Sequence, residues 1–246
     1  MLVVGGTRGI GRVVARRLAE DDQIVSIVGR RKPDDAADPS GITSWTADVS
    51  DLAALRRTLA EIVERCGPLS AAVLSQRYRG AGDDWAGEIA TSLTATRELL
   101  EWAGEHFEDL GRGKSLVVVS SIAGRFVASE QPVSYHVAKA AMAQMVRFYA
   151  VSLGRKAIRV NAISPGTIVK EESKGFYAMH PEIEELYRNI VPLGRMGTSE
   201  DVAELAAFLV SDRASFLTGQ DIVLDGGVSL QSHESMSRLL AGVRNR

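Results

Sequence analysis

The sequence has a single cysteine, Cys66, among its 246 residues. One thiol excludes an internal disulfide framework and is typical of a reducing compartment. Long apolar runs are also missing, because none approaches the roughly 20 residues that a membrane-spanning helix needs. No basic-then-apolar leader follows Met1. We therefore expect a cytoplasmic protein that does not interact with membranes.

An excess of charge of one sign is absent as well. The 29 basic and 31 acidic residues leave a net charge of -2, which gives no electrostatic reason to expect nucleic acid as a partner. The 45% hydrophobic and 24% charged residues are typical of a soluble globular protein. The length allows one large α/β domain with a sizeable core. Metal-ligating clusters are not evident, so we expect no metal site.

Strand-like and helix-like segments alternate along the whole chain. A segment at 168–197 interrupts this alternation with mixed aromatic and charged residues, which is typical of a substrate lid. Alternation of this kind predicts a doubly wound α/β fold, a parallel sheet with helices on both faces, in a single domain. We expect strands at 2–4, 24–28, 45–48, 70–74, 114–120, 158–163 and 221–224, and a loop at 33–41. We expect helices after residue 11 and at 51–65, 89–107, 133–153 and 198–210. Ser50 is the expected N-cap of the helix at 51–65, and Thr198 caps the last helix.

Three glycines, Gly5, Gly9 and Gly11, lie between the first expected strand and the first helix. Because they lack side chains, backbone N–H groups and the helix N-terminus can approach a pyrophosphate. Glycine loops also occur purely as tight turns, but the position after the first strand favours a dinucleotide-binding loop.

The residues after the second strand indicate which dinucleotide is preferred. Enzymes that use NAD usually place a carboxylate there to bind the ribose hydroxyls, whereas this chain has Arg30 and Arg31, with Arg8 in the glycine loop. Guanidinium groups suit a 2′-phosphate, so NADP(H) is favoured, with NAD(H) as the alternative. A solvated basic turn is the non-functional interpretation. Asp48, after the third strand, is positioned to accept a hydrogen bond from the adenine amino group, with Val49 beside that ring.

Tyr135 and Lys139 are separated by one helical turn, so both side chains leave the same face of a helix. A nearby ammonium favours the phenolate, and lowering a tyrosine pKa from about 10 to roughly 7 takes around 4 kcal/mol. A unit charge about 4 Å away supplies that much at an effective dielectric constant of about 20. Alone, the pair is better explained as an exposed helical pair than as an active site. A serine upstream, Ser120 or Ser121, would hold a substrate oxygen for the proton transfer.

The order of these motifs resembles that of a short-chain dehydrogenase/reductase. The resemblance runs from residue 2 to about 229 and rests on the glycine loop, Asp48-Val49, Ser121, Tyr135-x-x-x-Lys139, Asn161-Ala-Ile-Ser-Pro165-Gly166, Val191-Pro-Leu-Gly-Arg195, Phe208-Leu-Val-Ser-Asp212 and Leu217-Thr-Gly-Gln220 before Asp225-Gly-Gly227. It implies a Rossmann-type sheet of seven strands, a nicotinamide cofactor, and a homotetramer or homodimer. The cofactor half would span roughly 1–110, the catalytic half roughly 111–229, and a C-terminal tail 230–246.

The resemblance also assigns roles to individual residues. Tyr135 would exchange the proton of the reacting oxygen, Lys139 would hold the nicotinamide ribose and lower the phenol pKa, and Ser121 would orient the substrate oxygen. Pro165, Gly166 and the backbone near Ile168 would meet the carboxamide. The complete set expected to bind the cofactor is Gly5, Thr7, Arg8, Gly9, Ile10, Gly11, Arg30, Arg31, Asp48, Val49, Ser75, Tyr135, Lys139, Pro165, Gly166 and Ile168.

Four positions depart from the family pattern. Val4 replaces a threonine with a mainly structural role, and Ser92 replaces the helix asparagine that holds a relay water. Lys170 replaces a threonine that binds the carboxamide, and Ser75-Gln76-Arg77-Tyr78 replaces Asn-Asn-Ala-Gly. These changes indicate a divergent member with an altered relay or nicotinamide pocket.

The sequence thus predicts an NADP(H)-dependent oxidoreductase that transfers a hydride to or from a small-molecule carbonyl or alcohol. Two alternatives remain open. One is a dinucleotide-binding sensor or assembly protein with weakened catalysis, and the other is an isomerase or dehydratase on the same fold.

Overall fold

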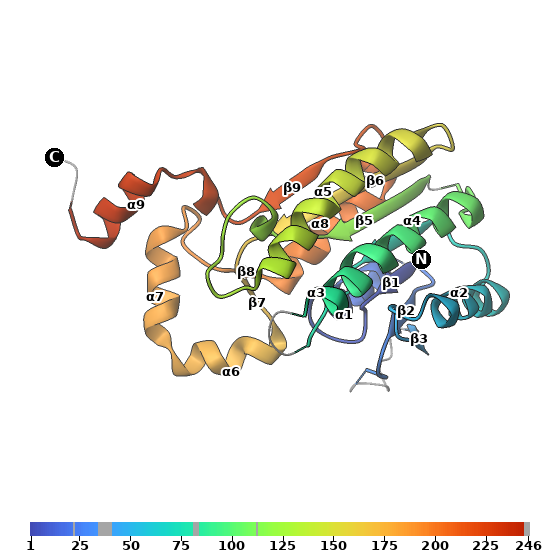
Figure 1. The fold of residues 1–246 in the computed structure, drawn as a ribbon, viewed down its shortest axis with the longest axis horizontal. Helices are drawn as coiled ribbons and strands as arrows, with labels where there is room; N and C mark the ends of the chain where they lie inside the picture. The colour runs from blue at the N-terminus through green and yellow to red at the C-terminus, as the bar shows by residue number, and fades with distance from the viewer. Residues whose placement is uncertain (22, 34–40, 81–83, 112, 244–246) are drawn as a thin grey trace.

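A parallel sheet of seven strands forms the centre of the computed structural model, which describes residues 1–21, 23–33, 41–80, 84–111 and 113–243. Its strand order is β3-β2-β1-β4-β5-β6-β9. In Figure 1, β3 and β9 lie at opposite ends of this sheet. The strands are β1 (Leu2–Val4), β2 (Ser26–Gly29), β3 (Thr43–Thr46), β4 (Ala71–Leu74), β5 (Lys114–Val119), β6 (Ile158–Pro165) and β9 (Asp221–Leu224). The expected single-domain α/β fold with seven parallel strands is therefore confirmed.

The strand order reverses between β1 and β4, whose last residues, Val4 and Leu74, are paired in register. The chain that leaves β1 continues to β2 on one side, and the chain that leaves β4 continues to β5 on the other side. In open parallel sheets, ligands bind in the crevice that this divergence leaves at the carboxyl ends of the strands. The glycine loop follows β1, and the segment Ser75–Tyr78 follows β4, so both lie at this crevice.

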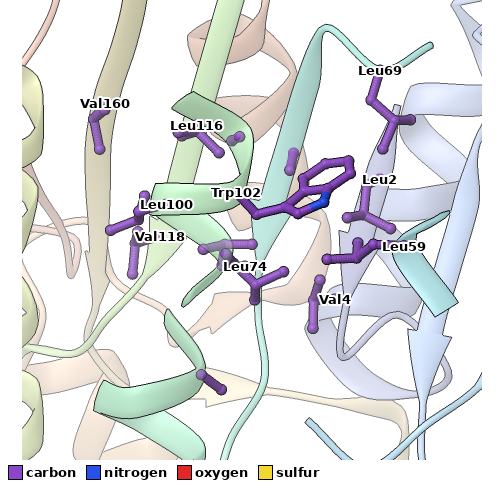
Figure 2. Close-up of a cluster of buried hydrophobic side chains, with 14 of the residues drawn as sticks. Leu2, Val4, Leu59, Leu69, Leu74, Leu100, Trp102, Leu116, Val118 and Val160 are labelled. Atoms are coloured by element: carbon purple, nitrogen blue, oxygen red, sulfur yellow. The ribbon is translucent and has the colours of Figure 1, made fainter. Parts of the chain in front are cut away.

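Helices cover both faces of the sheet. Successive side chains of a strand point to opposite faces, so Leu2 and Val4 belong to one buried cluster and Val3 belongs to the other. The first cluster, part of which is drawn in Figure 2 around Trp102, packs against α2 (Leu52–Cys66), α4 (Ala95–His106) and α5 (Val133–Gly154). The second packs against α1 (Gly9–Glu20) and α8 (Ser199–Val210).

Helix α5 fixes the positions of Tyr135 and Lys139. Its buried residues Lys139, Met142, Val146, Tyr149 and Leu153 recur every three or four positions, which forms one continuous stripe against the sheet. Tyr135 lies in the first turn and is partly exposed at the carboxyl edge of the sheet. The helix therefore holds its two polar groups at the end of the molecule where the glycine loop lies.

Two local expectations were wrong. The helix expected over 89–107 is instead α3 (Trp85–Glu88), a π-helical segment η1 (Ile89–Thr94) and α4. The N-cap of α2 is Asp51, whose side chain accepts a hydrogen bond from the Ala54 amide at 3.0 Å. Ser50 precedes the cap position, and its hydroxyl donates to Asp48 instead. Residues 34–40 of the expected loop lie outside the described residues.

The interrupting segment contains two helices, α6 (Glu171–Met179) and α7 (Pro181–Ile190), neither of which buries a residue. Two short parallel strands, β7 (Ile168–Val169) and β8 (Gly197–Thr198), bring its ends together. In Figure 1, α6, α7 and the C-terminal α9 (His233–Leu240) extend away from the sheet. The remaining elements are the 3₁₀ turns η2 (Ile122–Gly124), η3 (Asp212–Ala214) and η4 (Val228–Leu230). Among the described residues, no helix is both long and apolar enough to cross a membrane.

Candidate functional site

The glycine loop is packed against its neighbours without room for side chains. Gly5 has a φ of +79°, and a Cβ on it would lie 2.7 Å from the amide nitrogen of Gln76. A Cβ on Gly11 would lie 2.3 Å from the carbonyl oxygen of Gly5. The amide of Gly5 also donates to the carbonyl of Val28 at 2.8 Å. The loop is thus fixed between β2 and β4, with the N-terminus of α1 opening beside it.

A cavity of about 280 Å³ lies over the carboxyl ends of β1, β2 and β3. It brings together eight of the residues that the sequence assigned to the cofactor. These are Gly5, Thr7, Arg8, Arg30, Arg31, Asp48, Val49 and Ser75. Gly9 and Gly11 do not line it. The absence of a Cβ at Gly11 lets α1 begin against the backbone of Gly5 and Gly6.

The charged groups of this cavity are exposed. Arg8, Arg30 and Arg31 all stand at its rim, and no acidic residue follows β2 directly. Asp48 accepts hydrogen bonds through Oδ1 from the hydroxyl of Ser50 at 2.7 Å and from its amide at 3.0 Å. These bonds, with a contribution from the charge of Arg30, lower the pKa of Asp48 below its ordinary value of 3.8. Asp48 is therefore a fixed, ionised acceptor.

A second cavity, of about 80 Å³, is lined by Tyr135 and Lys139. The ammonium of Lys139 lies 5.4 Å from the centre of the Tyr135 ring, and the residue is only 3% exposed. Its Nζ donates to the carbonyl of Val119 at 3.4 Å and contacts Sδ of Met142 at 3.6 Å. Burial lowers the pKa of Lys139 from 10.5 to about 8; the charge of Glu88 opposes this shift, and Arg77 and Lys170 add to it.

The two serines upstream are used differently. Ser120 lines the Tyr135 cavity, but its hydroxyl donates to the carbonyl of Lys139 at 3.3 Å. Ser121 does not line either cavity, and its Oγ accepts from the amide of Ala123 at 3.1 Å as the cap of η2. Among the described residues, nothing accepts the Ser121 hydroxyl proton. A Cβ on Gly124 would lie 2.8 Å from the carbonyl carbon of Lys139, so this glycine lets η2 pack against α5.

Four residues after β4 line both cavities: Ser75, Gln76, Arg77 and Arg79. The two cavities therefore share one wall, which these four residues form. Gln76 is 5% exposed, and its Nε2 donates to Oγ1 of Thr96 at 2.8 Å, whereas its buried Oε1 has no partner. An unpaired buried carbonyl oxygen costs free energy unless a ligand or water donates to it. The sequence analysis named Gln76 only within the Ser75–Tyr78 departure and missed its unpaired oxygen, because the pairing of the amide depends on Thr96, twenty positions away.

Glu88 is a second residue that the sequence analysis missed. It is 4% exposed and accepts a hydrogen bond from Ser92, which is fully buried, at 2.5 Å. The π-helical turn η1 starts directly after Glu88, and turns of this kind are frequent at functional sites. Its charge acts on Lys139 across the interface between this turn and α5. The resemblance singled out Ser92, and the four-residue spacing between Glu88 and Ser92 is the signal that could have identified Glu88.

The first residues of the interrupting segment reach back to the glycine loop. Lys170 lines the Tyr135 cavity, and its pKa is lowered by burial and by the charges of Arg77 and Arg79. Oε1 of Glu172 lies 3.3 Å from the guanidinium of Arg79. A Cβ on Gly9 would lie 2.9 Å from the same oxygen, so the Glu172 carboxylate sits at the N-terminus of α1.

The remaining predicted residues are placed as follows. Ile10 lines the Tyr135 cavity, whereas Pro165, Gly166 and Ile168 line neither cavity. Pro165 ends β6 and Ile168 begins β7, and both are buried. A Cβ on Gly166 would lie 2.8 Å from Cβ of Asp225. No cluster of metal-ligating side chains occurs in the part of the chain that the structure describes.

The chain matches one protein family over most of its length and is similar to characterised relatives. Residues 4–229 match the protein family described as enoyl-(acyl carrier protein) reductase. The chain is 30% identical over 243 residues to isoepoxydon dehydrogenase patN of Aspergillus clavatus, which covers 93% of each protein. It is 32% identical over 245 residues to an A-factor type gamma-butyrolactone 1′-reductase of Streptomyces virginiae, covering 93% of this chain and 95% of the relative.

Solved structures share the fold over nearly the full length. A short-chain dehydrogenase/reductase from Serratia marcescens is 25% identical and superposes with a TM-score of 0.80 over 93% of this chain and 96% of its own. A variant of ElxO with bound NADPH is 26% identical and has a TM-score of 0.81 over 94% of this chain and 98% of its own.

Proposed function

Because the chain belongs to the short-chain dehydrogenase/reductase family of oxidoreductases, we propose that it transfers a hydride between NADP(H) and a carbonyl or alcohol substrate. In this proposal Tyr135 is the general acid and base, Lys139 stabilises the phenolate, and Ser121 orients the substrate oxygen. NAD(H) is the alternative cofactor.

One observation carries this proposal: the cavity with the glycine loop and the cavity with Tyr135 share a wall. Ser75, Gln76, Arg77 and Arg79 line both, so one elongated ligand can extend from Arg30 to Lys139. A dinucleotide has this form, with a phosphate-bearing nucleotide at one end and a reactive ring at the other. A shared wall is not needed by a protein that binds only a mononucleotide.

The residues present fit NADP(H). The glycine loop has no room for a Cβ at Gly5 or Gly11, and among the described residues no hydrogen-bond donor contacts the buried Oε1 of Gln76. Three exposed guanidinium groups, those of Arg8, Arg30 and Arg31, suit phosphate oxygens. Asp48 and Val49 would hold the adenine, and Ile10, Pro165, Gly166 and Ile168 the nicotinamide side. The bound cofactor supplies or accepts the hydride.

The protein's own groups would handle the proton. The Tyr135 phenol, at the mouth of the smaller cavity, would give its proton to the substrate oxygen or take it back. The buried ammonium of Lys139 would stabilise the phenolate, because a charge acts more strongly where water is excluded. The Ser121 hydroxyl accepts from Ala123 but keeps its own proton, so it remains able to donate to the same oxygen.

The single cysteine favours a reducing, cytoplasmic compartment, and we propose a homodimer or homotetramer as the assembly. Within the single domain, we propose that residues 1–110 bind the cofactor, that 111–229 carry catalysis, and that 230–246 form a tail.

The Tyr135→Phe variant tests the proposal. We expect its turnover of carbonyl compounds with NADPH to fall by about a thousandfold, because general acid catalysis contributes about 10² to 10⁴ in rate. Titration of NADPH fluorescence should give a dissociation constant within about threefold of the wild type, because one hydroxyl is a small part of the cofactor contacts. A fully active variant would exclude the assigned role.

A broad panel of carbonyls and alcohols separates this function from its alternatives. Tight NADPH binding without turnover of any compound would favour a dinucleotide-binding sensor. Conversion of a substrate without net oxidation of NADPH would favour an isomerase or dehydratase.

A further inference from the structure

Positive charge is concentrated around Tyr135. Its cavity of about 80 Å³ is lined by four basic residues, Arg77, Arg79, Lys139 and Lys170. Arg77 lies 5.0 Å from the centre of the Tyr135 ring, and Lys139 lies 5.4 Å from the same centre. Like charges that line one cavity repel one another, and the repulsion is strongest for Lys139 and Lys170, which are buried and half-buried, whereas Arg77 and Arg79 are exposed. An arrangement of this kind is costly unless an anion binds within it.

The protein itself neutralises only part of this charge. Among the described residues, Arg79 is the member of the cluster with a carboxylate in ion-pair distance, that of Glu172. The guanidinium of Arg77 makes one hydrogen bond, to Oε1 of Gln131 at 3.1 Å, which leaves most of its five N–H donors unused. The ammonium of Lys170 has no hydrogen bond or ion pair in the part of the chain that the structure describes.

Arg77 is held in place from the side of the cavity opposite the strands. Gln131 belongs to the turn before α5, in which the amide of Gln131 donates to the carbonyl of Ala128 at 3.0 Å. His136 braces this turn, because its Nε2 accepts from the amide of Ala128 at 2.9 Å. Arg77 is exposed, and its hydrogen bond to Gln131 holds its guanidinium beside the Tyr135 ring.

Lys170 differs from the cations of the nucleotide cavity in where it points. It lines the Tyr135 cavity and not the larger one, whereas Arg8, Arg30 and Arg31 line the larger cavity and not the smaller. The nucleotide cavity thus has its own cations for phosphate groups. Lys170 is placed at the reaction end, where a substrate would lie, and Arg77 lies on the wall shared by the two cavities, beside the Tyr135 ring.

We propose that Arg77 and Lys170 bind an anionic group of the substrate, a carboxylate or a phosphate, close to the carbon that is oxidised or reduced. The substrates would be oxo acids, hydroxy acids or phosphorylated ketones and alcohols. This inference rests on the proposed function, because it assigns a substrate class to the same site.

Binding to the protein–NADP⁺ complex tests this inference without turnover, because NADP⁺ cannot reduce a ketone. Two matched pairs separate the anions: acetoacetate with methyl acetoacetate, and dihydroxyacetone phosphate with dihydroxyacetone. Calorimetry should show at least one anion binding about tenfold or more tightly than its neutral partner, since hydrogen bonds between charged groups are stronger than those to neutral groups. Equal binding within both pairs would overturn the inference.

The variants Arg77→Met and Lys170→Met should remove this preference by lowering anion affinity about tenfold, with the neutral compounds changed by less than about threefold. Lys174→Met is the matched control, because Lys174 is on the same helix, is exposed and pairs with Glu171. Retained preference in both variants would overturn the inference. So would a loss of NADPH affinity in place of anion affinity, which would assign these cations to the cofactor.

Failure of the proposed function would look different. If the anion binds selectively and the two variants remove that selectivity, but NADPH reduces none of the four compounds nor any of the wider panel, the anion site stands and the reductase assignment falls. If methyl acetoacetate and acetoacetate are reduced with equal efficiency by all variants, the reductase assignment stands and the anion site falls.

Discussion

The two cavities differ in how far their charged groups are exposed: the larger forms the nucleotide end of the proposed site and the smaller forms the reaction end. At the nucleotide end, Arg30, Arg31 and Asp48 are exposed. At the reaction end, Glu88 and Lys139 are 4% and 3% exposed. Two unit charges about 4 Å apart interact by about 1 kcal/mol in water but by about 4 kcal/mol at an effective dielectric constant of 20. The same kind of substitution should therefore shift binding modestly at one end and alter chemistry and stability strongly at the other.

Lys139→Met should have the largest effect and should separate function from stability. We expect turnover to fall by about a thousandfold, because the phenolate loses its stabilising charge. We also expect the variant to be about 3 kcal/mol more stable to unfolding at pH 7, because burial lowers the pKa of Lys139 from 10.5 to about 8.

The pH dependence of that stability difference follows from the same shift. At pH 7 both the folded and the unfolded wild type carry the proton, so the folded state bears the full cost of the buried ammonium. Between pH 8 and 10.5 the unfolded state binds more protons, and wild-type stability rises with pH. Urea unfolding at pH 7 and pH 10.5 should show the gap closing, with Lys174→Met as an exposed control. A gap that is the same at both pH values would contradict the low pKa.

Glu88→Gln sharpens the comparison at the buried end. The charge of Glu88 raises the pKa of Lys139, so its removal should lower that pKa further. We expect the alkaline limb of the pH–rate profile to move down by about one unit, with about tenfold less activity near pH 8.5 and little change near pH 6.

Ser92→Ala is the matched control for Glu88→Gln. It removes the hydrogen bond at 2.5 Å but keeps the carboxylate, so the profile should keep its position. If the serine variant shifts the profile as far as the glutamine variant, the effect comes from packing around η1 rather than from charge.

The Arg30→Ala/Arg31→Ala double variant tests the exposed end. We expect the dissociation constant of NADPH to rise about tenfold and that of NADH to change by less than about twofold, because only NADPH carries the 2′-phosphate. Fluorescence titration measures both, and Arg57→Ala, an exposed arginine of α2, serves as the control. Equal weakening for both cofactors would assign the two arginines to general electrostatic attraction.

Glu172→Gln should have the smallest effect and the opposite sign. The Glu172 carboxylate lies at the N-terminus of α1 beside Arg79, where a cofactor phosphate is expected. Removing its charge should tighten NADPH binding by about threefold, because exposed charge interactions are worth less than about 1 kcal/mol. Glu171→Gln, which alters the neighbouring exposed acid, should leave the affinity unchanged. Weaker binding in Glu172→Gln would mean that Glu172 supports the bound state.

The sequence predicted the order of strands and helices because alternating apolar segments and turn residues are local signals. Tyr135 and Lys139 were predicted to share a face because helical spacing fixes it, and the structure places them on one cavity. The π-helical turn at Ile89–Thr94 could not be predicted, since its hydrogen-bond shift leaves no trace in residue types. The convergence of Arg77 and Lys170, about ninety positions apart, depends on the paths that the chain takes after β4 and β6 at the edge of the sheet, and the spacing of residues does not reveal it.

The close packing of the glycine loop has a consequence for how this chain can evolve. Any side chain at Gly5 or Gly11 would collide with backbone atoms, at 2.7 Å and 2.3 Å respectively, and backbone cannot rotate away as a side chain can. These two positions tolerate no variation. Arg30 and Arg31, by contrast, stand in open solvent and can be exchanged without disturbing their neighbours. Related chains can therefore change their preference between the two dinucleotides through surface substitutions, while Gly5 and Gly11 stay unchanged.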